Sequence, residues 1–232
     1  MWHAQQFIVK MSQNQSQKSK WDHSWDSSGL GSRSSHQEIR EFYADWANEY
    51  DRELLDNLGY AGHKKAAETL AKWVKNKDAR ILDAGAGTGL VGECLQQLGY
   101  NNLDALDISP EMLEIAEKKG IYKNMYVDTL GGPTPIQLPS NQYDAVLIIG
   151  AITHTRAAAL DELIRITRHN GVIIFTLRVD VAEDPDNEYD FKQKLPQLES
   201  EKKVELLANP RTAYRMPYDC FMYSYRVLKD ND

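Results

Sequence analysis

Cysteine is scarce in this chain of 232 residues, which contains only Cys94 and Cys220. Two cysteines without a paired spacing form neither a disulfide framework nor a zinc site, so we expect two reduced thiols and no metal. Long apolar runs are also lacking, since none reaches the roughly 18 residues that a membrane-spanning helix needs. The first residues lack the apolar core of a signal peptide. We therefore expect a cytoplasmic protein, with the nucleus left open, and no membrane partner.

An excess of positive charge is lacking too. The chain has 27 Lys and Arg against 34 Asp and Glu, for a net charge of −7. Because a surface that coats nucleic acid needs clustered Lys and Arg, this balance disfavours a nucleic-acid partner. The apolar fraction of 42% and the charged fraction of 26% are typical of a globular protein. We expect a monomer.

The organisation along the chain follows from composition and periodicity. Residues 1–35 are rich in Ser, Gln, Asn and Lys and predict a disordered tail, whereas 36–232 predict one domain. Within that domain short apolar strands alternate with helices, which is typical of an α/β fold with a parallel sheet covered on both faces. Strands are expected at 80–83, 102–107, 125–128, 143–150, 171–178, 203–207 and 220–228, and helices from 36, then at 62–75, 89–98, 110–119, 157–167 and up to about 201.

The most informative segment runs from Asp83 through Gly85, Gly87 and Gly89 to Leu90. Its glycines let the backbone turn sharply beside a ligand, and the helix that follows favours an anionic group. A dinucleotide site would carry a further glycine where Leu90 stands. Asp83 would repel a pyrophosphate, but it suits a ligand that has both an ammonium and a carboxylate. S-adenosylmethionine is such a ligand.

Acidic residues also end the next two expected strands. In open α/β sheets the ligand lies beyond the carboxyl ends of the strands. Asp107 is placed to accept hydrogen bonds from ribose hydroxyls; the less favoured alternative is a helix N-cap acid ahead of Ser109. Asp128 is placed to accept from an adenine amino group, or it is simply a loop acid. Ile108 and Met112 are either adenine contacts or core residues.

Taken together, these segments and Tyr143-Asp144-Ala145-Val146 resemble the successive motifs of class I S-adenosylmethionine-dependent methyltransferases. The segments 42–51, 148–151 and 163–172 are similar to the methyltransferase-like branch of the family from the Williams–Beuren deletion region. The resemblance implies a Rossmann-like doubly wound sheet of seven strands, mostly parallel with an antiparallel last strand. It also implies that S-adenosylmethionine is the cofactor and S-adenosylhomocysteine the product. The implied cofactor contacts are Asp83, Gly85, Ala86, Gly87, Thr88, Gly89, Asp107, Ile108, Met112, Asp128, Thr129 and Gly150. Tyr43, Trp46 and Tyr50 either close over the methionyl end or belong to an amphipathic helix that packs on the sheet.

The acceptor side is less defined. His154 follows the fourth strand, where the acceptor is expected, and is either a general base or a solvated loop residue. Arg178 either faces an anionic substrate or lies on the surface at the sheet edge. The Asn/Asp-Pro-Pro-Tyr motif of base-amino methylation is absent, since Gly150-Ala151-Ile152-Thr153 stands in its place.

We therefore expect a methyltransferase acting on an unidentified small molecule or protein by in-line displacement. One alternative is a cofactor-binding protein that acts through partners without transferring a methyl group. An NAD-dependent oxidoreductase is the less favoured alternative.

Overall fold

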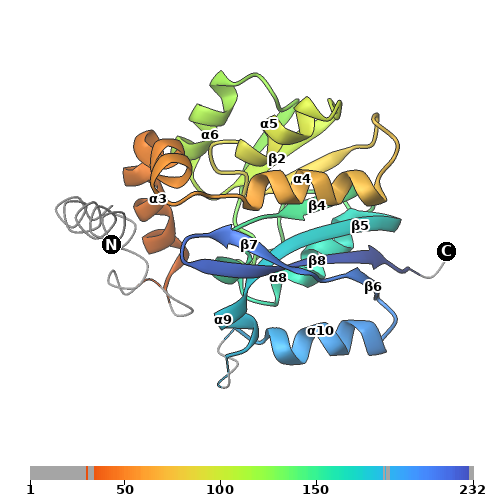
Figure 1. The fold of residues 1–232 in the computed structure, drawn as a ribbon. Coiled ribbons are helices and arrows are strands. Elements are labelled where there is room, and N and C mark those ends of the chain that lie inside the picture. The colour runs from red at the N-terminus through yellow and green to blue at the C-terminus, as the bar shows by residue number, and fades with distance from the viewer. Residues whose placement is uncertain (1–29, 31–33, 185, 187–188, 230–232) are drawn as a thin grey trace, which may run out of the picture.

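A computed structural model describes residues 30, 34–184, 186 and 189–229. The expected tail, 1–35, lies almost wholly outside these residues and stays a prediction. Figure 1 shows a central twisted sheet with helices on both of its faces. The strands are β1 (Ile81–Ala84), β2 (Leu103–Asp107), β3 (Asn124–Val127), β4 (Tyr143–Ile148), β5 (Thr167–Arg178), β6 (Val204–Ala208), β7 (Arg211–Arg215) and β8 (Tyr218–Val227). The helices are α3 (His36–Arg52), the π-helical turn η2 (Glu53–Asn57), α4 (Gly62–Trp73), α5 (Leu90–Gln97), α6 (Pro110–Lys118), α7 (Ile152–Thr155), α8 (Ala159–Ile166), α9 (Val179–Ala182) and α10 (Phe191–Ser200).

The sheet confirms the expected α/β class and differs from the expectation in one strand. Its path is β3-β2-β1-β4-β5-β8-β6, in which the first five strands are mutually parallel and β8 is antiparallel to both of its neighbours. The eighth strand is β7, which lies off this path and pairs with β8. The segment was not expected as a strand because Arg211–Arg215 is short and largely polar.

Both faces of the sheet are apolar and covered. Alternate residues of β1 point to opposite faces, with Ile81 in the core under α4 and α5 and Leu82 in the core against α8 and α10. Helix α6 packs beside α5 on the first face, over β2 and β3. This doubly covered arrangement holds the strand ends, and the loops after them, in register.

Helix α3 lies outside the two covering layers. It begins with a capping box between Ser35 and Glu38 and packs against α6 (Figure 1). Its buried side includes Ile39 and Trp46. Within the described ranges, we find no helix with the length and apolar character needed to cross a bilayer.

Candidate functional site

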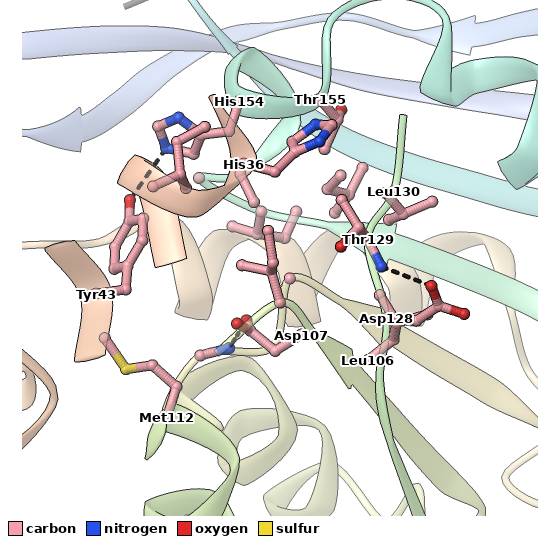
Figure 2. Close-up of a pocket in the computed structure, with 18 of the residues that line it drawn as sticks. His36, Tyr43, Leu106, Asp107, Met112, Asp128, Thr129, Leu130, His154 and Thr155 are labelled. Carbon is pink, nitrogen blue, oxygen red and sulfur yellow. Dashed lines mark hydrogen bonds between the residues drawn. The ribbon is translucent and has the colours of Figure 1, made fainter. Parts of the chain in front are cut away.

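A cavity of about 670 Å³ lies where the carboxyl ends of β1, β2 and β4 meet helix α3. Figure 2 shows side chains from these elements converging on it. Its lining includes ten of the expected site residues, namely Tyr43, Tyr50, Gly85, Gly87, Asp107, Ile108, Met112, Asp128, Thr129 and Gly150, together with the expected acceptor-side residue His154.

The loop after β1 forms the floor of the cavity. Gly85 and Gly87 have φ angles of +70° and +54°, a region that L side chains rarely adopt. Among the described residues, no heavy atom beyond the chain neighbours lies within 4 Å of the position that a Cβ of Gly87 would take. At Gly85, by contrast, a Cβ would approach that of Ala151 to 2.6 Å. The backbone at Gly87 therefore faces open space in which a ligand can contact it.

Asp107 is held at the end of β2 by backbone amides. Its carboxylate accepts a hydrogen bond from the amide of Gly87 at 2.7 Å, dashed in Figure 2, and another from the amide of Ser109 at 2.9 Å. Burial raises the pKa of this carboxyl, although these amides oppose the shift. Because a carboxylate has about four acceptor positions, Asp107 can still accept from ligand hydroxyls.

The side wall of the cavity combines an acid with apolar groups. Asp128 accepts from the amides of Thr129 at 2.7 Å and Gln137 at 2.9 Å, so it orders the loop that follows β3. The apolar lining beside it comes from Leu106, Ile108, Met112, Leu130, Ile148 and Ile149. A flat aromatic base suits this wall, since apolar surface surrounds one polar position.

Helix α3 closes the cavity from the opposite side. The Tyr43 hydroxyl and His154 Nε2 share a hydrogen bond of 3.0 Å, which joins α3 to α7 (Figure 2). Burial, and secondarily the charge of Arg178, lowers the pKa of His154 to about 4. Its imidazole is therefore neutral at physiological pH and a weaker base than an ordinary histidine.

Three charged residues and a threonine tie α3 to the glycine loop. Thr88 donates a short hydrogen bond to Asp51, near the end of α3. Lys119 bridges Asp51 and Glu93, at 2.9 Å to each carboxylate. Sequence analysis missed this tether because its members lie far apart along the chain and match no motif.

Asp83 lies beneath the glycine loop and outside the lining of the cavity. It is 1% exposed; its Oδ2 accepts a 2.6 Å hydrogen bond from Tyr122, and within the described part of the chain its Oδ1 has no hydrogen-bond partner. Burial raises its pKa to about 7. An unpartnered buried carboxylate oxygen is costly, and it indicates a missing cationic or donor group.

Four other expected contacts also lie outside the lining. Ala86 packs in a small core cluster with Leu113, Thr88 belongs to the tether, and Gly89 is the N-cap of α5. The expectation that Trp46 closes over the ligand differs from the structure. Its indole is 2% exposed and donates to Glu53 at 2.9 Å, because it faces the core side of α3.

Sequence analysis also missed lining residues. Ile39 and His36 line the cavity one and two helical turns before Tyr43, as the 3.6-residue period of α3 would have indicated. Thr155 lies at the end of α7, a four-residue helix with no sequence signal.

The residues present fit S-adenosylmethionine. The open space beside the Gly87 backbone admits the methionine part of the ligand, and Asp107 suits a pair of hydroxyls. The unpartnered oxygen of Asp83 suits an ammonium. Among the described residues no group of three or more His, Cys, Asp or Glu is arranged to hold a metal ion.

Comparisons with known proteins agree with this fit. Residues 82–175 match a family described as "Methyltransferase domain". Human Methyltransferase-like protein 27 is 35% identical over 143 residues, which are 60% of this chain and 57% of that protein. The chain thus spans little more than half the length of this curated relative.

Solved structures share the fold. Magnesium protoporphyrin IX methyltransferase from Synechocystis PCC 6803, with bound SAM, has a TM-score of 0.61 at 18% identity and covers 87% of this chain and 99% of its own. The [4+2]-cyclase SpnF has a TM-score of 0.65 at 14% identity, and the match covers 84% of this chain and 96% of the SpnF chain. At these identities the likeness concerns the fold alone.

Proposed function

We propose that this chain is a class I S-adenosylmethionine-dependent methyltransferase and that it transfers a methyl group from that cofactor to an acceptor that enters beside His154. The observation that carries the proposal is the pairing of Gly87 and Asp107. A backbone open to a ligand is joined there by a 2.7 Å hydrogen bond to a buried carboxylate, on the floor of the cavity where the ends of β1, β2 and β4 meet α3.

The proposed cofactor contacts follow the expected roles. Gly85 and Gly87 would hold the methionine part, Asp107 the ribose hydroxyls and Asp128 with Thr129 the adenine, beside Ile108 and Met112. Gly150 would border the methyl end, and Tyr43 and Tyr50 would cover it from α3. Asp83, from beneath the loop, would offset the ammonium. Thr88 would act indirectly, through the tether, and Trp46 would support α3 from the core. Ala86 and Gly89 would shape the loop.

The cofactor supplies a methyl group that its sulfonium already activates. The chain has mainly to align the acceptor in line with the methyl group and sulfur and to exclude water, and such alignment is worth about 7–11 kcal/mol. The α3 tether and the bond between Tyr43 and His154 close the cavity to solvent on one side. His154, with a pKa near 4, suits hydrogen bonding to an acceptor better than removing a proton from it.

The domain boundaries, 36–232, and a monomeric state belong to this proposal too. So does a cytoplasmic location.

Two experiments test the proposal. Calorimetry with S-adenosylmethionine, S-adenosylhomocysteine and NAD should show binding of the first two and none of NAD. Incubation with a labelled methyl donor and cell extract should then label a product. Binding of NAD alone would contradict the cofactor assignment. Tight cofactor binding without any labelled product would favour a non-transferring protein, an outcome kept in view because a cyclase shares the fold.

A further inference from the structure

A second, smaller cavity adjoins the first. It has a volume of about 390 Å³ and shares two lining residues, Gly150 and His154, with the larger cavity. The other lining residues are Thr153, Thr176, Arg178, Tyr214 and Arg215. Both cavities therefore border the same residues at the end of β4.

The unexpected strand β7 builds much of this second cavity. Tyr214 and Arg215 are its last residues, and the following turn is bonded to the segment after η2. The Met216 amide donates to the carbonyl of Leu58 at 2.9 Å. The Ala61 amide donates to the carbonyl of Tyr214 at 2.9 Å. Both bonds hold the β7–β8 hairpin against the body of the protein, so the cavity is a fixed part of the fold.

Two arginines converge on this cavity from different strands. Arg178 ends β5 and Arg215 ends β7, and their guanidinium carbons lie 4.2 Å and 4.7 Å from the centre of the same ring, that of Tyr218. Arg178 also forms an ion pair with Asp180, outside the lining. Arg215 is 7% exposed. Two like charges held beside one ring, away from bulk water, repel each other, and an anion between them relieves that repulsion.

The charge of the lining points the same way. Among the described residues that line the second cavity, two are arginines and none is acidic. The positive potential reaches the junction of the cavities, because Arg178 contributes to the lowered pKa of His154. Arg178 and Arg215 also oppose the effect of burial on the pKa of Tyr214.

We propose that the methyl acceptor carries an oxyanion, a carboxylate or a phosphate, which docks in the second cavity on Arg178 and Arg215. This inference rests on the proposed function, since it names the class of acceptor for the same site. Guanidinium groups present paired N–H donors that match two oxygens of such an anion. The anion anchors the acceptor beside His154 and Gly150, where the cavities meet.

The test uses the full chain saturated with S-adenosylhomocysteine and three small probes, benzoate, phenyl phosphate and benzamide. Benzamide has nearly the shape of benzoate without its charge. The variants are Arg178→Gln, Arg215→Gln and the conservative Arg215→Lys. Arg211→Gln is the matched control, because Arg211 lies on the same strand, β7, but is exposed and pairs with Asp219. Calorimetry measures the affinity of each variant for each probe, and a separate titration measures its affinity for S-adenosylhomocysteine.

We expect at least one anionic probe to bind and benzamide not to bind. Arg178→Gln and Arg215→Gln should each lower the affinity for the anionic probe by about tenfold or more, which is the usual effect of losing a charged hydrogen bond. The affinity of Arg215→Lys for the probe should lie between those of the wild type and Arg215→Gln, and the affinity of Arg211→Gln should equal that of the wild type. Whichever of benzoate and phenyl phosphate binds more tightly identifies the oxyanion.

Three results would overturn the inference: benzamide binding as well as benzoate, both arginine variants keeping wild-type affinity, or no anionic probe binding at all. Unchanged affinity for S-adenosylhomocysteine in a variant shows that it has folded. If S-adenosylhomocysteine fails to bind the wild type, the proposed function fails instead. The same probes titrated into the chain alone then still decide whether the arginines bind an anion.

Discussion

The hydroxyl of Tyr43 and Nε2 of His154 lie 3.0 Å apart although 111 residues separate them in the chain. This bond joins the covering helix α3 to the short helix α7, at the junction of the two cavities. It holds the imidazole in one orientation and couples the position of α3 to that of the acceptor-side loop. Several expectations for variants follow from this and the neighbouring contacts.

Tyr43→Phe removes the hydrogen bond and keeps the ring. We expect the free energy of unfolding to fall by about 1–3 kcal/mol, because a partly buried imidazole nitrogen loses a partner. Labelled methyl transfer in extract should slow, since His154 is no longer oriented. Tyr50→Phe is the control, because the Tyr50 hydroxyl makes no hydrogen bond within the described residues, although its ring lines the same cavity. Equal stability and transfer rates in the two variants would show that the bond has no such role.

Gly87→Ala places a Cβ in the open space above the loop. We expect cofactor binding, measured by calorimetry, to be lost or strongly weakened, because the methyl group occupies the proposed ligand position. Gly120→Ala is a close control, since Gly120 has a φ of +64° and equally open surroundings but follows α6, outside the cavity lining. Both variants should cost about 1–2 kcal/mol of stability from left-handed backbone strain. Only Gly87→Ala should lose affinity for the cofactor. An equal loss of affinity in Gly120→Ala would show that backbone strain is the cause.

Asp107→Ala removes the acceptor of two backbone amides as well as the proposed ribose contact. We therefore expect a loss of about 1–3 kcal/mol in stability together with cofactor affinity weakened by about tenfold or more. Asp104→Ala supplies the comparison, because Asp104 is a buried acid on the same strand that accepts from Arg80, Asn124 and Tyr143. It should lose stability and keep its affinity for the cofactor. Wild-type affinity in folded Asp107→Ala would rule out the proposed pose.

Asp83→Asn should change how stability depends on pH. The carboxyl has a pKa of about 7 in the folded protein and an ordinary value of 3.8, so the folded state binds the proton more tightly. The wild type therefore loses stability as pH rises from about 4 to about 7. The neutral amide avoids this loss, so Asp83→Asn should be the more stable protein at pH 8, by a few kcal/mol, with the advantage vanishing near pH 4. Denaturant titrations of the ligand-free proteins measure the difference in the free energy of unfolding between the variant and the wild type. A difference that does not vary with pH would contradict the raised pKa of Asp83.

Asp51→Ala should release α3 from the glycine loop, because it removes the partner of both Thr88 and Lys119. Amide hydrogen exchange should rise across α3 and remain unchanged in α8, and the cofactor should dissociate faster. Arg52→Ala serves as the control, since Arg52 is exposed and, among the described residues, forms an ion pair with Glu49, its neighbour on the same helix. Protection of α3 that survives in Asp51→Ala would mean that packing alone holds this helix.

Local chemistry made much of the fold and the cavity floor predictable. Short apolar runs that end in an acid marked β1 and β2, and Ser109 followed by Pro110 marked the start of α6. The carboxyl ends of parallel strands meet at one edge of a sheet, so the sequence alone predicts that Gly87, Asp107 and Asp128 lie close together. Strand β7 could not, because its few polar residues gain their order from pairing with β8 rather than from their own pattern.

The sequence by itself determined the order along the chain of most strands and helices and the residues at the strand ends, because each depends on neighbours a few positions away. Only the tertiary structure decided which side of α3 faces the ligand, so that Tyr43 lines the cavity and Trp46 is buried in the core. Likewise, only the packed sheet brought Arg178 and Arg215 to one ring. Contacts between distant segments arise when the whole apolar core closes, and no local pattern encodes them.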